Sequence, residues 1–483
     1  MREIIIDPIT RLEGHGNISI FLNDAGEVEN AYLKVPELRG FEQFCIGRRA
    51  ELMPILTSRI CGVCPVAHHT AATKALDSAF KVEPPSAAKK LRELMYSGYI
   101  IYDHILHFYY LGGPDFIVGP EASPDKRNIL GVIEKVGIDV AREVIKHRAY
   151  GQKMTQILGG KATHPVCGLP GGMSKPLSEE NRVEIEKMAA SCLKFANFTL
   201  KIFHDIVLGN GKYVDMIKSD AYTMRTYYMG LVDSNNKVNF YDGRIRVVDP
   251  KGNEFLKFEP KDYLNHIGEN VEKWTYAKFP FLKKVGWNGL TYGEGSGIYR
   301  VGPLGRLNAS DGMATPFAQA EYEDMYKTLG KPVHGTLAFH WARLIELLYA
   351  TERALELIRD PEITSKNVRN KPGEPGEGVG VVEAARGTLF HHYVLDSDAL
   401  IKDVNMIVAT TNNYPAICMS IRDAAKGLIH GANVDQGVLN KVEMAFRAYD
   451  PCFGCATHFA IGQMPLTLKI YDHRKELIRT LQR

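Results

Sequence analysis

Cys61-Gly62-Val63-Cys64 and Cys452-Phe453-Gly454-Cys455 are two Cys-x-x-Cys pairs, one near each end of the chain. Thiolates are soft metal ligands, and the two-residue spacer lets both sulfurs of a pair face one ion. A zinc ribbon separates its pairs by roughly 15 to 20 residues, whereas 387 residues lie between Cys64 and Cys452. A metal bound by all four cysteines would therefore lie at the centre of a large fold and join its two ends.

The composition is that of an ordinary globular protein. The 483 residues are 45% apolar and 24% charged, and they suffice for several domains or one large unit. A net charge of +3 gives no electrostatic reason to expect nucleic acid or an anionic membrane as partner. The sequence contains no long apolar run and no signal peptide, so we expect a cytoplasmic protein without a membrane span.

Cysteine usage favours metal-bound or free thiols over a disulfide framework. The chain has eight cysteines, and four of them form the two pairs. The other four are irregularly spaced, and Cys192 lies within a predicted amphipathic helix as an apolar core residue. No iron-sulfur cluster is therefore expected in this chain.

Local patterns predict an α+β fold that is mainly α, with a central bundle of long helices and peripheral β-sheets. Three short strands are expected at residues 3–6, 17–22 and 28–34. Long helices are expected from Ser86 to about Gly112, from Ser178 to Gly209, and through the apolar positions between residues 341 and 358. Alternation predicts a ribbon with two hairpin turns over residues 237–258, and Pro and Gly predict a loop over residues 367–380.

Some polar residues have an ordinary structural interpretation when each is taken alone. Glu13 follows Arg11 directly after a strand, where such a segment is more often a solvated loop. Asp103, His104 and His107 lie in an aromatic helix and could simply satisfy one another in the core.

The chain as a whole resembles the large subunit of nickel-iron hydrogenases. Arg59 to His68 matches the motif Arg-x-Cys-Gly-x-Cys with a histidine four residues on, and Asp450 to His458 matches Asp-Pro-Cys-x-x-Cys-x-x-His. Further matches occur in order at residues 7–15, 39–42, 103–104, 107–109, 164–165 and 385–387. The resemblance thus covers essentially the whole chain.

The resemblance implies a buried bimetallic site where the N- and C-terminal segments meet. Cys61 and Cys452 would be terminal ligands of nickel, and Cys64 and Cys455 would bridge to an iron that carries carbon monoxide and cyanide. Dihydrogen would split heterolytically there, with the Cys452 thiolate as one candidate base.

The resemblance also gives roles to other polar residues. Arg386 would face the open side of the metals with a chiefly electrostatic role, since arginine stays charged, and Asp103 and Asp450 would orient it. His68 would donate a hydrogen bond to a bridging sulfur. Glu13 would accept the proton from a terminal cysteine, which replaces the loop interpretation.

A second metal site is implied at Glu42 and His458. A carboxylate with water suits magnesium, and the imidazole makes iron an alternative. His164 would lie towards the nearest iron-sulfur cluster of a partner subunit. A maturation endopeptidase would cut after His458 and release residues 459–483.

Partners follow from the electrons that the reaction releases. The resemblance implies a small iron-sulfur subunit, together with another electron-transfer subunit, as well as a heterodisulfide reductase complex, as in the archaeal methyl-viologen-reducing type that does not reduce deazaflavin. Deazaflavin-reducing and NAD(P)-reducing types stay open. The expected segments are 1–80 (β region and first motif), 81–230 (bundle), 231–300 (β-rich insertion), 301–380 (bundle and loop), 381–458 (second motif) and 459–483 (maturation segment).

Three rival hypotheses are weaker. A structural zinc protein would use the same four cysteines without the matching flanks. A non-catalytic relative in a proton-pumping complex would lack the cysteines. A hydrogen sensor normally lacks the C-terminal extension.

Overall fold

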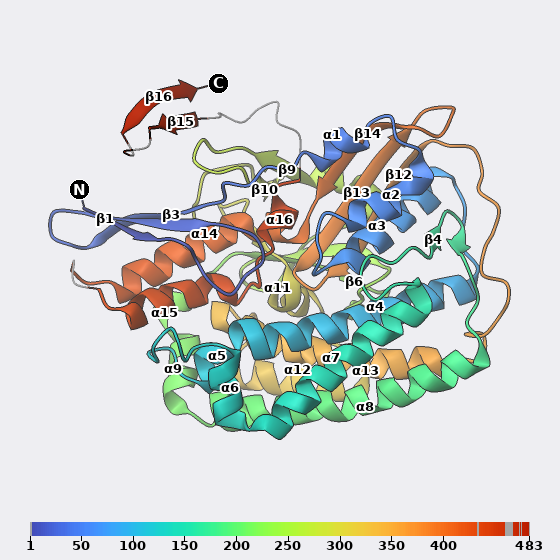
Figure 1. The fold of residues 1–483 in the computed structure, drawn as a ribbon, viewed down its shortest axis with the longest axis horizontal. Helices are drawn as coiled ribbons and strands as arrows, with labels where there is room; N and C mark the ends of the chain where they lie inside the picture. Colours follow the sequence, from blue (N-terminus) through green and yellow to red (C-terminus); the bar gives the residue numbers. More distant parts are fainter. Residues whose placement is uncertain (1, 432–433, 459–466, 473, 475, 483) are drawn as a thin grey trace.

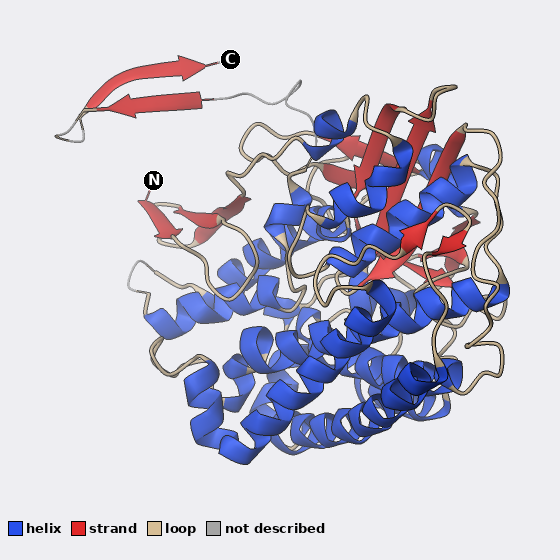
Figure 2. Ribbon diagram, turned by 45° about the vertical axis from the view of Figure 1, so that its right-hand side comes forward, coloured by secondary structure: helices blue, strands red, loops and turns tan. Residues whose placement is uncertain are grey.

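The computed structural model describes residues 2–431, 434–458, 467–472, 474 and 476–482. Long helices lie beside one another across the lower half of the molecule, and the sheets gather in the upper half (Figures 1 and 2). The long helices of the lower half are α4 (Ser86–Leu106), α7 (Ile138–Gly159), α8 (Glu179–Phe203), α12 (Pro316–Leu329) and α13 (Phe339–Ile358). This arrangement confirms the predicted α+β, mainly α, fold.

The helix starts follow their sequence signals. Ser178 caps α8, because its side chain accepts a hydrogen bond from the backbone N–H of Asn181. The predicted helix continues past Phe203 as a π-helix, η3 (His204–Leu208), and α4 likewise widens into η2 (His107–Gly112). The predicted lengths are therefore confirmed, although the local winding differs.

The N-terminal sheet is antiparallel with the order β1 (Arg2–Ile6), β2 (Asn17–Leu22), β3 (Val28–Lys34). Its strands agree with the prediction to within one residue. Helix α14 (Ala409–Leu428) packs on β3. The connection from β1 to β2 contains Glu13 and reaches the C-terminal cysteine motif, as described below.

A second antiparallel sheet consists of β12 (Glu377–Ala384), β13 (Gly387–Leu395) and β14 (Ile401–Ile407), and α3 (Pro65–Ala79) packs against it. The predicted loop is wrong at its end, because β12 already begins at Glu377. Gly378 and Gly380 belong to the strand. A Cβ at Gly378 would lie 2.2 Å from the backbone nitrogen of Ala79 in α3, so the close approach of helix and strand requires glycine.

The turn between β12 and β13 sets the position of Arg386. Ala384 pairs with Gly387, which leaves Ala385 and Arg386 as a two-residue hairpin turn. The side chain of Arg386 is buried at this tip. A rigid hairpin thus delivers one guanidinium into the interior.

The peripheral ribbon is shorter than predicted. It comprises β7 (Arg244–Val248) and β8 (Glu254–Phe258) in a sheet with β6 (Tyr227–Val232) and β11 (Tyr299–Arg300). Residues 237–243 make only an isolated bridge at Val238, so the first predicted hairpin turn is wrong. Asp233 and Asn239 side chains bond to nearby backbone N–H groups there, which favours a loop.

The C-terminal hairpin pairs β15 (Thr467–Tyr471) with β16 (Leu477–Gln482) and lies apart from the body of the molecule (Figures 1 and 2). The predicted strand is confirmed over residues 467–470, and Leu466 lies outside the described residues. Among the described helices, none is both long and apolar enough to cross a membrane.

Shorter elements complete the fold. They are α1 (Phe41–Cys45), α2 (Met53–Ser58), α5 (Pro114–Ile117), α6 (Ile129–Val136), β4 (Gly168–Leu169), β5 (Gly172–Met173), α9 (Gly211–Lys218), α10 (Tyr263–His266), β9 (Ile267–Asn270), β10 (Phe279–Leu282), α11 (Gly302–Ala309), α15 (Gln436–Arg447), α16 (Phe453–Ala456) and the single 3-10 turns η1 (Ala50–Leu52), η4 (Asp220–Tyr222), η5 (Pro260–Asp262) and η6 (Thr336–Ala338).

Candidate metal centre

The two Cys-x-x-Cys pairs meet in the interior. Cys64 directly precedes α3, and Cys452 directly precedes α16. The Sγ atoms of Cys61 and Cys452 are 3.3 Å apart, and those of Cys64 and Cys455 are also 3.3 Å apart. All four sulfurs lie within 4.8 Å of one another, and all four residues are buried. The fold therefore converts two distant motifs into one compact group.

This group fits a thiolate-bound metal and does not fit a disulfide. All four cysteines are free, and the sulfurs of Cys452 and Cys455 are 2.8 Å apart, whereas a disulfide bond is about 2.05 Å long. Hydrogen bonds from neighbouring thiols lower the pKa of Cys61 well below its usual value, while burial raises the pKa values of Cys452 and Cys455 well above theirs. Four thiolates this close and this dry need a cation to share them.

Backbone contacts hold the two chain ends together around the sulfurs. Glu13 and Cys452 form a parallel β-bridge, and the N–H of Phe453 donates to the carbonyl oxygen of Glu13 at 3.0 Å. The guanidinium of Arg39 donates to the carbonyls of both Ile60 and Gly454, next to the first and second motif. Arg39 belongs to a stretch that resembles the family, but the sequence did not indicate that it bonds to both motifs.

The Glu13 side chain is in contact with the group. The Sγ of Cys452 donates to Oε2 of Glu13 at 2.9 Å, and the N–H of Gly454 donates to the same oxygen at 2.9 Å. Burial, followed by the charge of Cys61, raises the pKa of Glu13. Since Glu13 is only partly buried, its carboxyl group lies between the dry cysteines and the surface.

Arg386 lies between two carboxylates. Its Nη1 is 3.1 Å from Oδ2 of Asp103 in α4, and its Nη2 is 2.8 Å from Oδ2 of Asp450. Burial disfavours the charged guanidinium, but the two carboxylates outweigh it and raise the pKa of Arg386 well above its usual value. Burial also raises the pKa of Asp450 to about 7. The structure thus brings together the three residues that the sequence grouped.

A small cavity adjoins the cysteines. Its volume is about 10 Å³, close to that of one water-sized sphere. Its lining is largely apolar, with two basic side chains, and consists of Cys64, Ala67, His68, Ala384, Arg386, Leu389, Val408, Ala409, Thr410, Cys452 and Cys455. Burial lowers the pKa of His68 to about 3, so the imidazole is neutral, and among the described residues its Nε2 has no hydrogen-bond partner. The cavity therefore combines soft sulfur ligands with an unused imidazole nitrogen.

Comparison with known proteins agrees with this geometry. The family model described as "Nickel-dependent hydrogenase" matches residues 39–127 and 142–458, and a model described as "HoxL-like" matches residues 3–38. The chain belongs to the nickel-dependent hydrogenase family. It is a large subunit of that family, and the buried cysteine group is the part of the fold that fits a nickel-iron site.

Similar proteins span the full length of this hydrogenase subunit. An F420-non-reducing hydrogenase iron-sulfur subunit of Archaeoglobus profundus is 48% identical over 100% of both chains. An F420-non-reducing hydrogenase subunit of Methanothermobacter thermautotrophicus is 40% identical, also over 100% of both. Among solved structures, an NAD+-reducing [NiFe]-hydrogenase in the H2-reduced state aligns with a TM-score of 0.87 and 36% identity, covering 95% of this chain and 100% of that one.

The two residues that the sequence assigns to a second metal site, Glu42 and His458, lie close to each other in this hydrogenase subunit. Nε2 of His458 lies 3.7 Å from Oε1 of Glu42, and both residues are buried. The sequence did not indicate Met406, whose carbonyl oxygen lies 2.8 Å from Nε2 of His458 and whose N–H donates to Oε1 of Glu42 at 2.8 Å. Nδ1 of His458 in turn contacts the carbonyl of Cys455 at 2.6 Å. A carboxylate, an imidazole and a carbonyl oxygen thus converge beside the cysteines.

His164 lies on the outer side of the first cysteine motif. It is partly exposed, and its Nδ1 is 2.9 Å from the carbonyl oxygen of Ser58. Val166, two residues further along the chain, has an exposed apolar side chain, at 36%. The placement is compatible with the predicted orientation towards a partner subunit.

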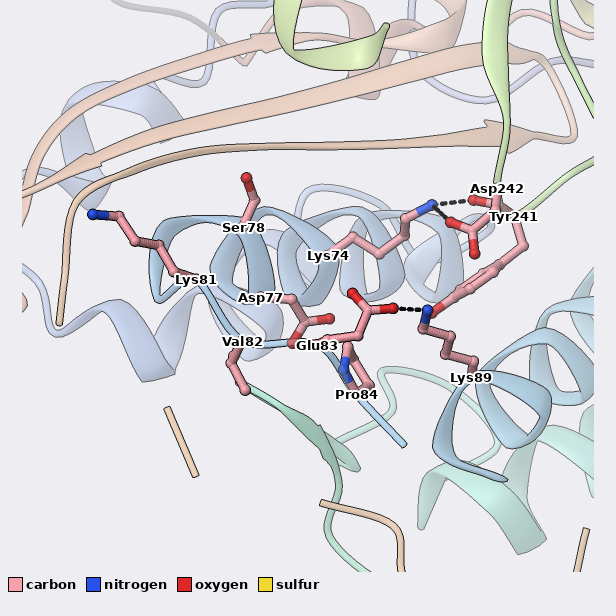
Figure 3. A pocket seen from close by; sticks show the side chains of 10 residues that line it. All are labelled: Lys74, Asp77, Ser78, Lys81, Val82, Glu83, Pro84, Lys89, Tyr241 and Asp242. Atoms are coloured by element: carbon pink, nitrogen blue, oxygen red, sulfur yellow. Dashed lines mark hydrogen bonds and ion pairs between the residues drawn. The ribbon is translucent and has the colours of Figure 1, made fainter. Parts of the chain in front are cut away.

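A large polar surface pocket, by contrast, offers few unpaired charges (Figure 3). It has a volume of about 410 Å³ and lies at the C-terminal half of α3. Lys74 bonds to Asp242 at 2.7 Å, Lys89 pairs with Glu83, and Asp77 pairs with the buried Arg92. These contacts account for the pocket as a solvated edge of the fold, and the chemistry of this subunit lies at the cysteines.

Proposed function

We propose that this chain is the catalytic large subunit of an F420-non-reducing hydrogenase, which cleaves or forms dihydrogen and passes electrons through a small iron-sulfur subunit to a heterodisulfide reductase-type acceptor. The observation that carries the proposal is the buried group of four free cysteines, with Glu13 bonded directly to one of them. The names of the full-length archaeal relatives support the F420-non-reducing type.

In this proposal all four cysteines would hold the metals, with Cys61 and Cys452 as ligands of nickel and Cys64 and Cys455 shared between nickel and an iron that would carry carbon monoxide and cyanide. The metals, when bound, supply the heterolytic cleavage of dihydrogen. The small cavity supports a position for the iron beside the sulfurs, because Cys64, Cys452 and Cys455 border it together with apolar side chains such as Leu389 and Val408. Small diatomic ligands need such a dry, tightly walled space.

In this proposal, protein side chains transfer the proton and supply a fixed positive charge. Cys452 holds a proton at Sγ, and Glu13 takes it over through the 2.9 Å hydrogen bond and passes it towards the surface. Arg386 presents a fixed positive charge to the cavity, because Asp103 and Asp450 hold two of its nitrogens. The raised pKa of Glu13 supports its role, since burial makes the carboxylate a better proton acceptor.

His68 donates a hydrogen bond from Nε2 to a bridging sulfur in this proposal. Glu42 and His458 bind magnesium, or iron, at the second site, and the Met406 carbonyl is a suitable third ligand. Hard oxygen donors support magnesium, and the imidazole keeps iron as the alternative.

The processing of the C-terminus is a further part of the proposal. A maturation endopeptidase cuts after His458 and removes residues 459–483. Two observations support it, because the family match ends at residue 458 and the solved relative covers 95% of this chain but all of its own length. Intact mass spectrometry of the protein from its native host checks this, and a mature chain that ends at Arg483 would contradict it.

A second candidate is an NAD(P)-reducing hydrogenase. It is favoured by the solved NAD+-reducing relative, with its TM-score of 0.87, and a deazaflavin-reducing type also remains compatible with the chain. The acceptor is decided by other subunits. Affinity purification of the complex separates these types, because a heterodisulfide reductase, a deazaflavin-binding protein and an NAD-binding flavoprotein are different partners.

One experiment tests the central proposal. The complex purified under reducing, anaerobic conditions is analysed for nickel, iron and zinc, for infrared bands of carbon monoxide and cyanide, and for dihydrogen-dependent reduction of methyl viologen. We expect one nickel, infrared bands and viologen reduction. A chain that carries zinc, without bands and without activity, would instead be a structural zinc protein.

A further inference from the structure

A chain of three buried side chains leads from β13 to the cavity beside the cysteines. Nδ1 of His391 is 2.5 Å from the hydroxyl of Tyr393, and Nε2 of His391 is 3.1 Å from Nδ1 of His68. His391 and Tyr393 are two residues apart on β13, so both point to the face that α3 covers. All three residues are fully buried, and the described contacts leave only Nε2 of His68 without a partner.

We propose that Tyr393 and His391 are positioning residues that hold His68 in the tautomer with the proton on Nε2. A neutral imidazole has one N–H donor and one acceptor nitrogen, so each ring passes the direction of its hydrogen bonds to the next ring. The inference rests on the proposed function, in which Nε2 of His68 donates to a bridging thiolate. It deepens that function by naming the residues that make the donation possible.

The direction of the hydrogen bonds through these three side chains is set at the end that faces the sulfurs. A metal-bound thiolate can only accept a hydrogen bond, so Nε2 of His68 has to be the donor and Nδ1 the acceptor. Nε2 of His391 then has to donate to His68, and Nδ1 of His391 has to accept from Tyr393. The phenol of Tyr393 can fill this role, because a hydroxyl can donate and it lies 2.5 Å from Nδ1 of His391.

The opposite direction leaves a repulsive contact. If Nδ1 of His391 carried the proton and donated to Tyr393, Nε2 of His391 would accept from His68. The lone pair of His68 Nε2 would then face the sulfurs in a dry cavity, where two acceptors repel each other. The sulfurs therefore set the direction, and the phenol of Tyr393 supports it by donating to Nδ1 of His391.

The hydrogen bonds from Tyr393 through His391 to His68 have a measurable consequence at the metals. A hydrogen bond to a bridging thiolate withdraws electron density from the sulfur and hence from the iron that it bridges. Losing that bond increases back-donation into the carbon monoxide and cyanide ligands and lowers their stretching frequencies. The infrared bands thus report the tautomer of His68 without any measurement of turnover.

The test compares anaerobic, metal-loaded complexes that carry Tyr393→Phe, His391→Leu, His391→Gln or His68→Leu, with Tyr109→Phe as the matched control. Tyr109 is equally buried, and its hydroxyl bonds to Thr199 in α8, away from the chain. Nickel and iron contents and thermal midpoints are recorded for each variant. Infrared bands are compared in one redox state.

We expect Tyr393→Phe and His391→Leu to shift the bands to lower wavenumber, in the same direction as His68→Leu and by a smaller amount. His391→Gln keeps an N–H that can donate to His68 and so retains bands close to those of the native enzyme. Tyr109→Phe leaves them unchanged, because it removes a buried hydroxyl elsewhere.

Two results would overturn the proposal in distinguishable ways. If His68→Leu shifts the bands but Tyr393→Phe and His391→Leu do not, then His68 acts without His391 and Tyr393 and the inference is wrong. If His68→Leu itself leaves the bands unchanged, then the contact of His68 with a bridging sulfur fails, and with it that part of the proposed function.

Discussion

Two fully buried polar clusters in this hydrogenase subunit differ in how many of their polar atoms have hydrogen-bond partners. Around Arg306 of α11, Nε and Nη2 bond to the two oxygens of Glu346 at 2.5 and 2.7 Å, and Nη1 bonds to Glu383 at 2.7 Å. Every guanidinium nitrogen there has a carboxylate or carbonyl partner. Beside the cysteines, by contrast, one atom each of Asp103, Arg386 and His68 lacks a hydrogen-bond partner within the part of the chain that the structure describes.

The difference separates a cluster that stabilises the fold from a cluster with polar atoms left for a reaction. A buried polar group without a partner costs free energy, so a fold that keeps several of them in one place needs another group to complete them. The guanidinium of Arg306 is fully paired and joins α11, α13 and β12. Of the residues with open atoms beside the cysteines, Arg386 and His68 line the small cavity. Each prediction below challenges this contrast.

The largest effect is expected for Cys455→Ala. Removing one of four shared thiolates leaves an incomplete ligand set, and we expect nickel and dihydrogen-dependent viologen reduction to fall below detection. Metal analysis of the purified protein measures it. The matched control is Cys192→Ala in α8, whose buried sulfur is 3.9 Å from the carbonyl of His147 and which should retain nickel. Full nickel content in Cys455→Ala would contradict the assignment.

Glu13→Gln comes next. The amide is nearly isosteric but cannot take up a proton, so we expect turnover to fall by about 100-fold or more with the metals and thermal midpoint retained. Hydrogen oxidation and hydrogen–deuterium exchange measure the loss. Glu37→Gln is the matched control, since Glu37 lies nearby and pairs with the exposed His15. Turnover at the native rate in Glu13→Gln would remove Glu13 from the proton path.

Arg306→Met tests the completed cluster. Without the guanidinium, the carboxylates of Glu346 and Glu383 stay buried and unpaired, which should lower the free energy of unfolding by about 3–5 kcal/mol. Denaturant unfolding of the metal-free chain measures the change. Arg142→Met is the control, because Arg142 and Asp139 form an exposed pair whose loss costs at most about 1 kcal/mol. Equal unfolding midpoints for the two variants would abolish the contrast.

The smallest effect concerns a half-exposed pair, in which Nε2 of His204 is 2.6 Å from Oε1 of Glu321. The hydrogen bond with Glu321 raises the pKa of His204 above 6.5, so its stabilisation is complete below that pH and is lost as the pH rises through the raised value. We expect His204→Gln to lower stability by less than about 1 kcal/mol at about pH 5.5 and hardly at all at about pH 9. A loss that grows with pH would contradict this sign.

Much of the fold followed from local signals. The strands at 17–22 and 28–34 alternate apolar residues, and Ser178 offers a cap to the following helix, so each could be predicted from a short window. Gly378 and Gly380 could not, because glycine usually weakens strands. Glycine is required at both positions of β12 because α3 packs too close for a larger side chain, and this packing is not visible in the sequence.

The site shows the same limit. Its cysteines and charged residues have a chemical identity that the sequence displays. The sequence could not indicate the carbonyl of Met406, because every residue has a carbonyl. It could not indicate the double contact of Arg39 either, because most arginines lie on the surface. The Tyr393–His391–His68 chain depends on two residues of β13 facing α3, which only the assembled structure reveals.

The β-bridge between Glu13 and Cys452 has a consequence for the timing of synthesis. Cys61 and Cys452 are 391 positions apart, and a ribosome that adds about 5–20 residues per second needs roughly 20–80 seconds to cover that interval. During this period the first cysteine pair exists without its counterpart. The emerging chain therefore carries two unshielded thiols for many seconds, and only a reducing environment or an escort protein preserves them until the last residues leave the ribosome.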